Sequence, residues 1–103
     1  MKFYVIVRAD LSPGAQIAQS CHAVVAFANE HRGIHDHWRD TSNVIVCLQV
    51  HDEASLLALA REASVRGCEH AVFREPDFGN AATAVALAPS GAEIVKELRL
   101  AGR

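Results

Sequence analysis

Four short runs of β-branched and other apolar residues alternate with segments of helical periodicity along this chain of 103 residues. The runs are FYVIV at 3–7, NVIVCLQV at 43–50, HAVFR at 70–74 and ATAVALA at 82–88. Short continuous runs of this kind are typical of strands that are covered on both faces. Because parallel neighbours need helical crossovers, the order strand, helix, strand, helix, strand, strand, helix predicts a mixed sheet with helices on both faces.

The first helix is predicted from its cap and from its apolar spacing. Ser12 is a typical N-cap, and Pro13 suits the first helical position, where an amide proton is not needed. We expect this helix to run to about Glu30. A stripe at helical spacing predicts its core-facing side, and consists of Ile17, Cys21, Val24, Val25 and Ala28.

Two more helices are predicted after the second and fourth strands. Asp52 caps a helix that ends near Arg66, and Ser90 with Glu93 forms a capping box for a short last helix. Residues 31–42 lack clear periodicity, so we expect a loop there with at most one extra helical turn. The predicted core-facing residues of the two helices are Leu56, Ala60, Ala63, Ile94, Val95 and Leu98.

Length and composition predict one domain, residues 1–103, that can bury a sizeable core. Half of the residues are hydrophobic and the formal net charge is -2, so no basic field attracts nucleic acid and any RNA contact must be local. No segment approaches the ~18 apolar residues of a membrane span, and we expect no membrane partner. Three widely spaced cysteines in apolar surroundings predict reduced, buried thiols and a cytoplasmic protein.

Charged residues follow two of the predicted strands, at the edge where a cleft is expected. They are Arg8, Asp10, Arg74, Glu75 and Asp77. The carboxylates could act as a general base on water, and the arginines could bind a phosphate or a carboxylate. The alternative is that Arg8 and Arg74 pair with Asp10 and Glu75 at the rim of the sheet.

A second group of candidates lies on the first helix. Gln16, Gln19 and His22 are three residues apart and therefore form one line on the helix surface. Gln19 and His22 could reach one ligand. Alternatively, the line is the polar border of a half-buried helix, with His22 hydrogen-bonded to the backbone in the core.

Other residues carry weaker signals. His31, Asp36 and their neighbours His35 and His37 could bind zinc, but their spacing matches no metal signature and we expect a solvated loop. Trp38 and Phe78 could stack on a base, although packing against the sheet is the default expectation. Cys21 belongs to the apolar stripe, so we expect a core residue rather than a nucleophile paired with His22.

Several collinear motifs resemble the type 2 peptidyl-tRNA hydrolases, and the segments SPGAQIAQSCHA and EPD resemble the short bacterial-type relatives of that family more closely. The motifs are VRADL, AQSCHA, HDEASLLALA, FREP and TAVALAP. The resemblance implies a three-layer α/β/α domain with a four-stranded mixed sheet, often dimeric, that cleaves the ester between a peptide and tRNA. No stretch of the sequence identifies a dimer interface.

Two functional segments of that family are altered here. Its basic GKGK-like run, with a lysine thought to be catalytic, corresponds to SPGAQ, which places Ala15 at the lysine position. Its DAGxT loop corresponds to the shorter EPDFGN. Glu75 matches the acidic residue of that loop by position, with Asp77 as a second candidate for its role, and Thr83 matches a threonine of the following strand.

Two functions are therefore considered. In the first, the protein is an esterase without metal or organic cofactor, in which Glu75 or Asp77 activates water and His22 positions or protonates the ester. Substrate binding in this hypothesis is assigned to Arg8, Asp10, Gln16, Gln19, Arg74, Asn80 and Thr83. In the second, the protein is a non-catalytic module of the same fold that recognises acyl-tRNA, a small acidic ligand or a protein partner.

Overall fold

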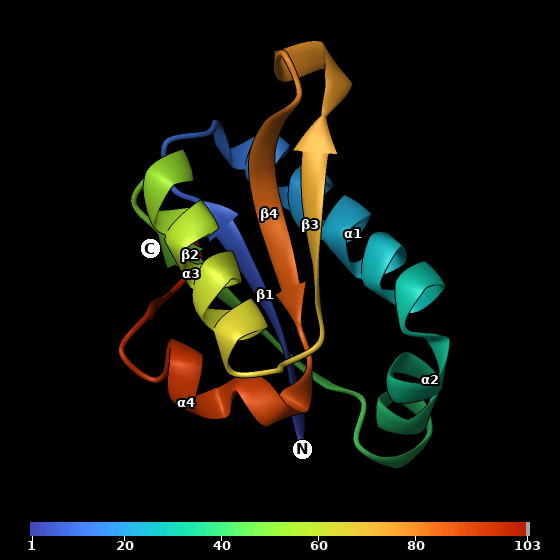
Figure 1. Cartoon of the computed structure of the whole chain (residues 1–103). Helices are drawn as coiled ribbons and strands as arrows, with labels where there is room; N and C mark the ends of the chain where they lie inside the picture. The colour runs from blue at the N-terminus through green and yellow to red at the C-terminus, as the bar shows by residue number, and fades with distance from the viewer. Residues whose placement is uncertain (103) are drawn as a thin grey trace.

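A five-stranded mixed sheet in the order β3-β4-β1-β2-β5 forms the middle layer of the computed structural model, which describes residues 1–102 (Figure 1). The strands are β1 (Lys2–Arg8), β2 (Val44–Val50), β3 (His70–Glu75), β4 (Ala81–Leu87) and β5 (Arg99–Leu100). The helices are α1 (Pro13–Glu30), α2 (Arg32–Thr41), α3 (Glu53–Val65) and α4 (Ala92–Val95), with 3-10 helices η1 (Pro76–Phe78) and η2 (Pro89–Gly91). Within residues 1–102, no helix combines the length and the apolar character that a membrane span requires.

Helices α1 and α2 cover one face of the sheet, and α3 and α4 cover the other (Figure 1). This arrangement confirms the predicted α/β/α class. The sheet has five strands rather than four, because Arg99 and Leu100 pair with Gln49 and Leu48 at the edge of β2. A strand of two residues contains no apolar run that periodicity could reveal.

The strand directions bring three carboxyl ends to one edge of the sheet. Strands β1 and β2 are parallel, and β4 is antiparallel to both β1 and β3. Strands β1, β2 and β3 therefore point the same way, which confirms the predicted meeting of the loops after β1 and β3. Ligands commonly bind at such an edge in α/β sheets.

The predicted core face of α1 is wrong for Ile17, Cys21 and Val25, whereas Val24 is partly buried against the core. The buried residues of this helix are Gln19, Ala23 and Phe27, whereas Ile17 and Val25 are 69% and 68% exposed. Helix α1 packs mainly on β4, β3 and β1, so its side toward β2 is left uncovered. Phe27 anchors the buried side through an edge-to-face contact with Phe3, with ring centroids 4.9 Å apart.

Residues 31–42 are helical rather than a loop. Trp38 fixes α2, because it is only 6% exposed and its Nε1–H donates to the Val44 carbonyl at 2.7 Å. Its ring also lies 4.9 Å from that of Phe3, which confirms the packing role expected for Trp38. Trp38 is the buried residue of α2, and the partly buried Ile34 also packs against the core.

The two predicted N-caps are confirmed, but the last capping box is not. The side chains of Ser12 and Asp52 accept hydrogen bonds from the amides of Ala15 and Ser55. Ser90 lies inside η2, where its hydroxyl is 3.3 Å from the Cys68 sulfur.

The prediction of three buried thiols also needs correction. Cys68 is buried, whereas Cys21 and Cys47 are exposed. These two cysteines belong to α1 and β2, and both lie on the uncovered side of α1.

Candidate functional site

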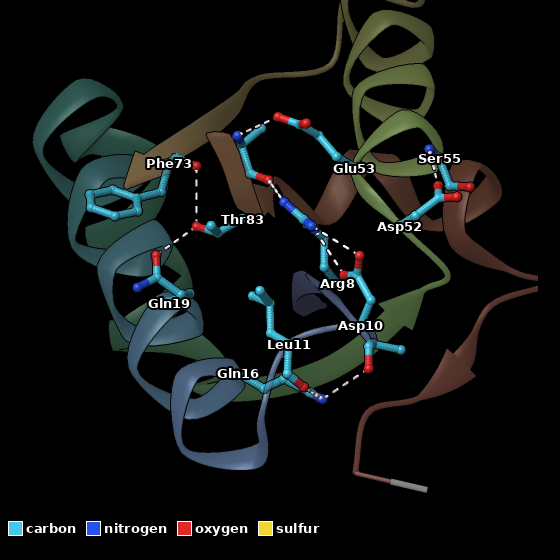
Figure 2. Close-up of polar contacts among 12 residues, drawn as sticks. Arg8, Asp10, Leu11, Gln16, Gln19, Asp52, Glu53, Ser55, Phe73 and Thr83 are labelled. Atoms are coloured by element: carbon cyan, nitrogen blue, oxygen red, sulfur yellow. Dashed lines mark hydrogen bonds and ion pairs between the residues drawn. The ribbon is translucent and has the colours of Figure 1, made fainter. Parts of the chain in front are cut away.

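A β-bulge turns Thr83 toward α1. Phe73 pairs with Ala84 and Arg74 pairs with Ala82, so Thr83 is an extra residue on β4. Regular alternation would place Thr83 and Ala84 on opposite faces of the sheet. The bulge instead lets the fully buried Thr83 hydroxyl reach Gln19 of α1 (Figure 2).

A chain of hydrogen bonds leads from Thr83 to a carboxylate. The Thr83 hydroxyl donates to Gln19 Oε1 at 2.6 Å, and Gln19 Nε2 donates to Glu75 Oε1 at 2.8 Å. Gln19 is only 4% exposed, so its amide has few alternative partners. The first bond fixes which end of the amide faces Glu75, and the second fixes the Glu75 side chain.

Glu75 is held in its ionised form at the end of β3. The hydrogen bond from Gln19 is the main reason that the pKa of Glu75 is lowered, and a bond from the Asp77 amide and the nearby His22 charge act in the same direction. Asn80 closes the turn with a positive φ of 62° and donates its amide to the Glu75 carbonyl at 3.0 Å. The turn therefore presents the carboxylate from a fixed backbone.

His22 lies beside this carboxylate on the surface of α1. Its ring is exposed and stacks on Phe73, with centroids 4.6 Å apart and an interplanar angle of 12°. The alternative that His22 is a core residue bonded to the backbone is therefore wrong. Stacking restricts the plane of the imidazole but leaves its ring nitrogens available for a ligand.

The two strand-end arginines lie apart from this cluster. Because Phe73 and Glu75 both contact α1, the intervening Arg74 points to the opposite face of the sheet. Arg74 does not pair with Glu75, and its Nη1 donates instead to the Asn80 carbonyl at 3.3 Å.

Arg8 is occupied by a bidentate ion pair and a backbone bond. Its Nε and Nη2 each donate to Asp10 at 2.9 Å, which confirms the rim pair and lowers the pKa of Asp10. Strand β1 no longer pairs with β4 beyond Ala84, and Arg8 Nη1 donates to the Ala82 carbonyl at 3.1 Å there. Glu53 accepts from the Ala82 amide at 2.7 Å (Figure 2). Arg8 and Glu53 therefore bond to the backbone groups of Ala82 that β1 leaves unpaired.

Gln16 likewise bonds to the protein's own backbone. Its Nε2 donates to the carbonyls of Leu11 and Ala9 at 2.8 and 3.4 Å and so holds the loop between β1 and α1 (Figure 2). Of the three residues that sequence placed on one helical line, only Gln19 and His22 join the Glu75 cluster.

The histidines between residues 31 and 37 do not converge. His31 bonds to the His70 carbonyl, while His35 lies 3.1 Å from Asp36. Across residues 1–102, no three His, Cys, Asp or Glu side chains come close enough together to hold a metal ion.

Comparison with known proteins decides the family. The sequence profile of the family described as "Peptidyl-tRNA hydrolase PTH2" matches residues 1–100. The chain belongs to the PTH2 family. The mouse protein named "Putative peptidyl-tRNA hydrolase PTRHD1" is 34% identical over 106 residues, covering 91% of this chain and 74% of that protein. The structure of a protein of unknown function from Agrobacterium tumefaciens, Atu0240, superposes with a TM-score of 0.69 at 15% identity over 96% of both chains, which shows the fold.

In this PTH2 family member, the first turn of α1 contains no lysine. Ala15 stands at the position that the resemblance assigns to a lysine, and its amide donates to Ser12 Oγ at 3.3 Å. The ionisable side chains of this cluster are Glu75, which bonds to Gln19, and His22, which stacks on Phe73.

Two residues at this edge of the sheet, Phe73 and Glu53, were not predicted from the sequence. Phe73, which supports His22, was detectable in principle because it is two residues before Glu75 and shares its face of the strand. The hydrogen bond of Glu53 could not be predicted from the local sequence, because its partner, the Ala82 amide, is 29 residues away.

Proposed function

We propose that this PTH2 family protein hydrolyses the ester between a peptide, or a related acyl group, and tRNA. The observation that carries the proposal is the Thr83–Gln19–Glu75 chain of hydrogen bonds, which holds an ionised carboxylate beside an exposed imidazole. Ester hydrolysis needs a fixed polar group that orients the attacking water and a second group that transfers the proton, and a carboxylate and an imidazole can fill these roles.

Glu75 is the better candidate than Asp77 for contact with water. The Glu75 carboxylate is fixed by Gln19, whereas the contact that Asp77 makes to this cluster is its backbone amide. A lowered pKa makes Glu75 a weak proton acceptor, so we assign it to orienting the attacking water and stabilising a neighbouring imidazolium.

His22 would carry the proton. As the water oxygen bonds to the ester carbon, His22 takes a proton from that water. When the bond between the carbon and the ribose oxygen breaks, His22 gives the proton to that oxygen, which leaves as a hydroxyl. The fully buried Thr83 and the nearly buried Gln19 act by positioning Glu75 rather than by touching the substrate.

The tRNA itself would be held weakly. Arg8 is neutralised by Asp10, and Arg74 lies on the other face of the sheet from Glu75, so few cations are available for phosphates. Asn80, on the exposed turn after Glu75, is the remaining candidate for a ribose contact. The proposal places the protein in the cytoplasm, where thiols such as Cys21 stay reduced.

Hydrolysis of labelled peptidyl-tRNA by the purified protein tests this function. We expect turnover by the wild type and a loss of about 100-fold in kcat for His22→Ala, because proton transfer contributes about that factor or more. Asp77→Asn is the matched control on the same edge and should keep most of the activity. Wild-type protein that fails to cleave several acyl groups contradicts the proposal.

Binding without catalysis is the second candidate, and the observation that favours it is Ala15 at the lysine position. In that case acyl-tRNA should still bind without being cleaved. Binding through phosphates should weaken as salt is raised, with a shallow slope because few cations are involved.

The Gln19→Met variant is expected to raise the pKa of Glu75 toward its ordinary value. The amide bond from Gln19 stabilises the ionised form, so its loss favours the protonated form. As pH falls, the variant should therefore lose the Glu75 charge at a higher pH than the wild type does. A ¹³C NMR titration of the Glu75 carboxyl measures this directly, and an unchanged titration curve would show that Gln19 does not control it.

A further inference from the structure

Strand β3 forms one edge of the sheet and leads to the candidate site. It is the first strand in the order β3-β4-β1-β2-β5, so one of its sides pairs with β4 and its other side ends the sheet (Figure 1). The strand ends at Glu75, the carboxylate of the proposed site. The opposite edge of the sheet is formed by β5, on the far side of β2.

Alternate residues of β3 turn their backbone groups toward β4. The carbonyls that do so accept hydrogen bonds from β4 or from residues next to it, and they belong to Glu69, Phe73 and Glu75. Neighbouring residues of a strand point their backbone groups to opposite sides. The even-numbered residues of β3 therefore face the outer edge, and these are His70, Val72 and Arg74.

Two amides and two carbonyls on this outer edge have no partner. The His70 carbonyl lies 3.1 Å from Nε2 of His31 and is already bonded. The amides and carbonyls of Val72 and Arg74, by contrast, bond to no group within residues 1–102. Unpaired backbone groups in a row along an edge strand are a ready template for another extended chain.

Helix α1 leaves this edge open beside the candidate site. It packs on the face of β3, where Gln19 bonds to Glu75 and His22 stacks on Phe73. His22 is exposed, so the space next to its ring is open to solvent. A chain added to β3 would therefore pass directly beside His22 and Glu75.

We propose that the outer edge of β3 binds the peptide of the substrate as an added strand, an inference that rests on the proposed function. Extended peptides add to sheet edges in this way, and main-chain hydrogen bonds then provide the affinity. Such bonds do not depend on the side chains of the peptide. This mode of binding suits a hydrolase whose substrates share one ester but differ in peptide sequence.

The position of the site fixes the direction of the added strand. The peptide is joined to tRNA through its carboxyl end, so this end must lie beside Glu75 at the carboxyl end of β3. The peptide therefore runs parallel to β3, with its amino end toward His70. In a parallel pair, each outward residue bonds to two residues of its neighbour, so Val72 and Arg74 together engage about four residues of an N-acetylated peptide.

Hydrolysis of N-acetylated peptidyl-tRNA with one, two, four or six residues tests the inference on the wild-type protein. We expect kcat/KM to rise about 10-fold or more from one residue to four, because each added backbone bond strengthens binding. It should stay constant beyond about four residues, because no free backbone group of β3 remains for them.

N-methylation of single peptide amides gives the matched control. Of two adjacent amides, only one faces β3. Methylating the second or the third residue from the ester should therefore lower kcat/KM by about 10-fold in one case and by less than about twofold in the other.

Hydrogen exchange gives a readout that needs no catalysis. The probe is an N-acetylated tetrapeptide joined to 3′-amino-3′-deoxyadenosine by an amide in place of the ester. At millimolar concentration it should slow the exchange of the Val72 and Arg74 amides, measured by NMR. The Ala71 amide is the internal control, because Ala71 pairs with Ala86 of β4 and its exchange should not change.

The outcomes separate this inference from the proposed function. Hydrolysis that depends on neither peptide length nor methylation overturns the added strand and leaves the hydrolase in place. Protection of Val72 and Arg74 by the probe without any turnover supports the peptide site and contradicts the hydrolase. Protection that appears when protein concentration alone is raised would show that β3 pairs with another copy of itself, and overturns the inference.

Discussion

Replacing Glu75 by Gln is expected to lower kcat for peptidyl-tRNA hydrolysis by about 100-fold or more, with a change in melting temperature of no more than about 3 °C. Gln has the shape of Glu and can still accept the hydrogen bond from Gln19, so the turn after β3 should keep its conformation. It has no charge, however, and cannot stabilise an imidazolium at His22. The loss should appear in kcat more than in KM, because the charge acts on the reacting water.

Steady-state hydrolysis and a thermal melt of the same preparation check this expectation. The Asp77→Asn protein is the control, because it removes a carboxylate two residues away whose side chain does not hold Gln19. Equal loss in both variants would point to the general negative charge of the turn rather than to Glu75. Full activity of Glu75→Gln would remove this carboxylate from the mechanism.

The edge of the sheet that carries the site could be predicted from sequence, but the grouping of residues at that edge could not. The order of the elements and the crossover rules predict that the carboxyl ends of β1 and β3 lie at the same edge, and the structure confirms this. The separation of Arg74 from Glu75 follows from simple alternation along β3. The contact of Thr83 with α1 depends on a bulge, and nothing in ATAVALA indicates where an extra residue is inserted.

The buried side of α1 could not be predicted from the spacing of its apolar residues. The helix has two candidate rows, and the one with more large apolar residues, including Ile17 and Val25, is the exposed one. The buried row contains Gln19, whose hydrogen-bond partners are 56 and 64 residues away in sequence. A buried polar residue is acceptable only when such partners exist, and a local pattern cannot show them.

Replacing Phe27 by Ala is expected to lower the free energy of unfolding by about 3–5 kcal/mol, whereas Val25→Ala should change it by less than about 0.5 kcal/mol. Phe27 is fully buried and packs between the rings of Phe3 and His31, at centroid distances of 4.9 and 4.8 Å. Its truncation would leave a cavity between α1 and β1. Val25 is two residues away on the same helix but is 68% exposed.

Urea unfolding followed by far-UV circular dichroism measures both changes. A domain of this size is commonly stable by only 5–15 kcal/mol, so Phe27→Ala should be close to unfolding at 37 °C. If Val25→Ala were the more destabilising change, the helix would bury the row with Ile17 and Cys21, and the contact between Gln19 and Glu75 could not form.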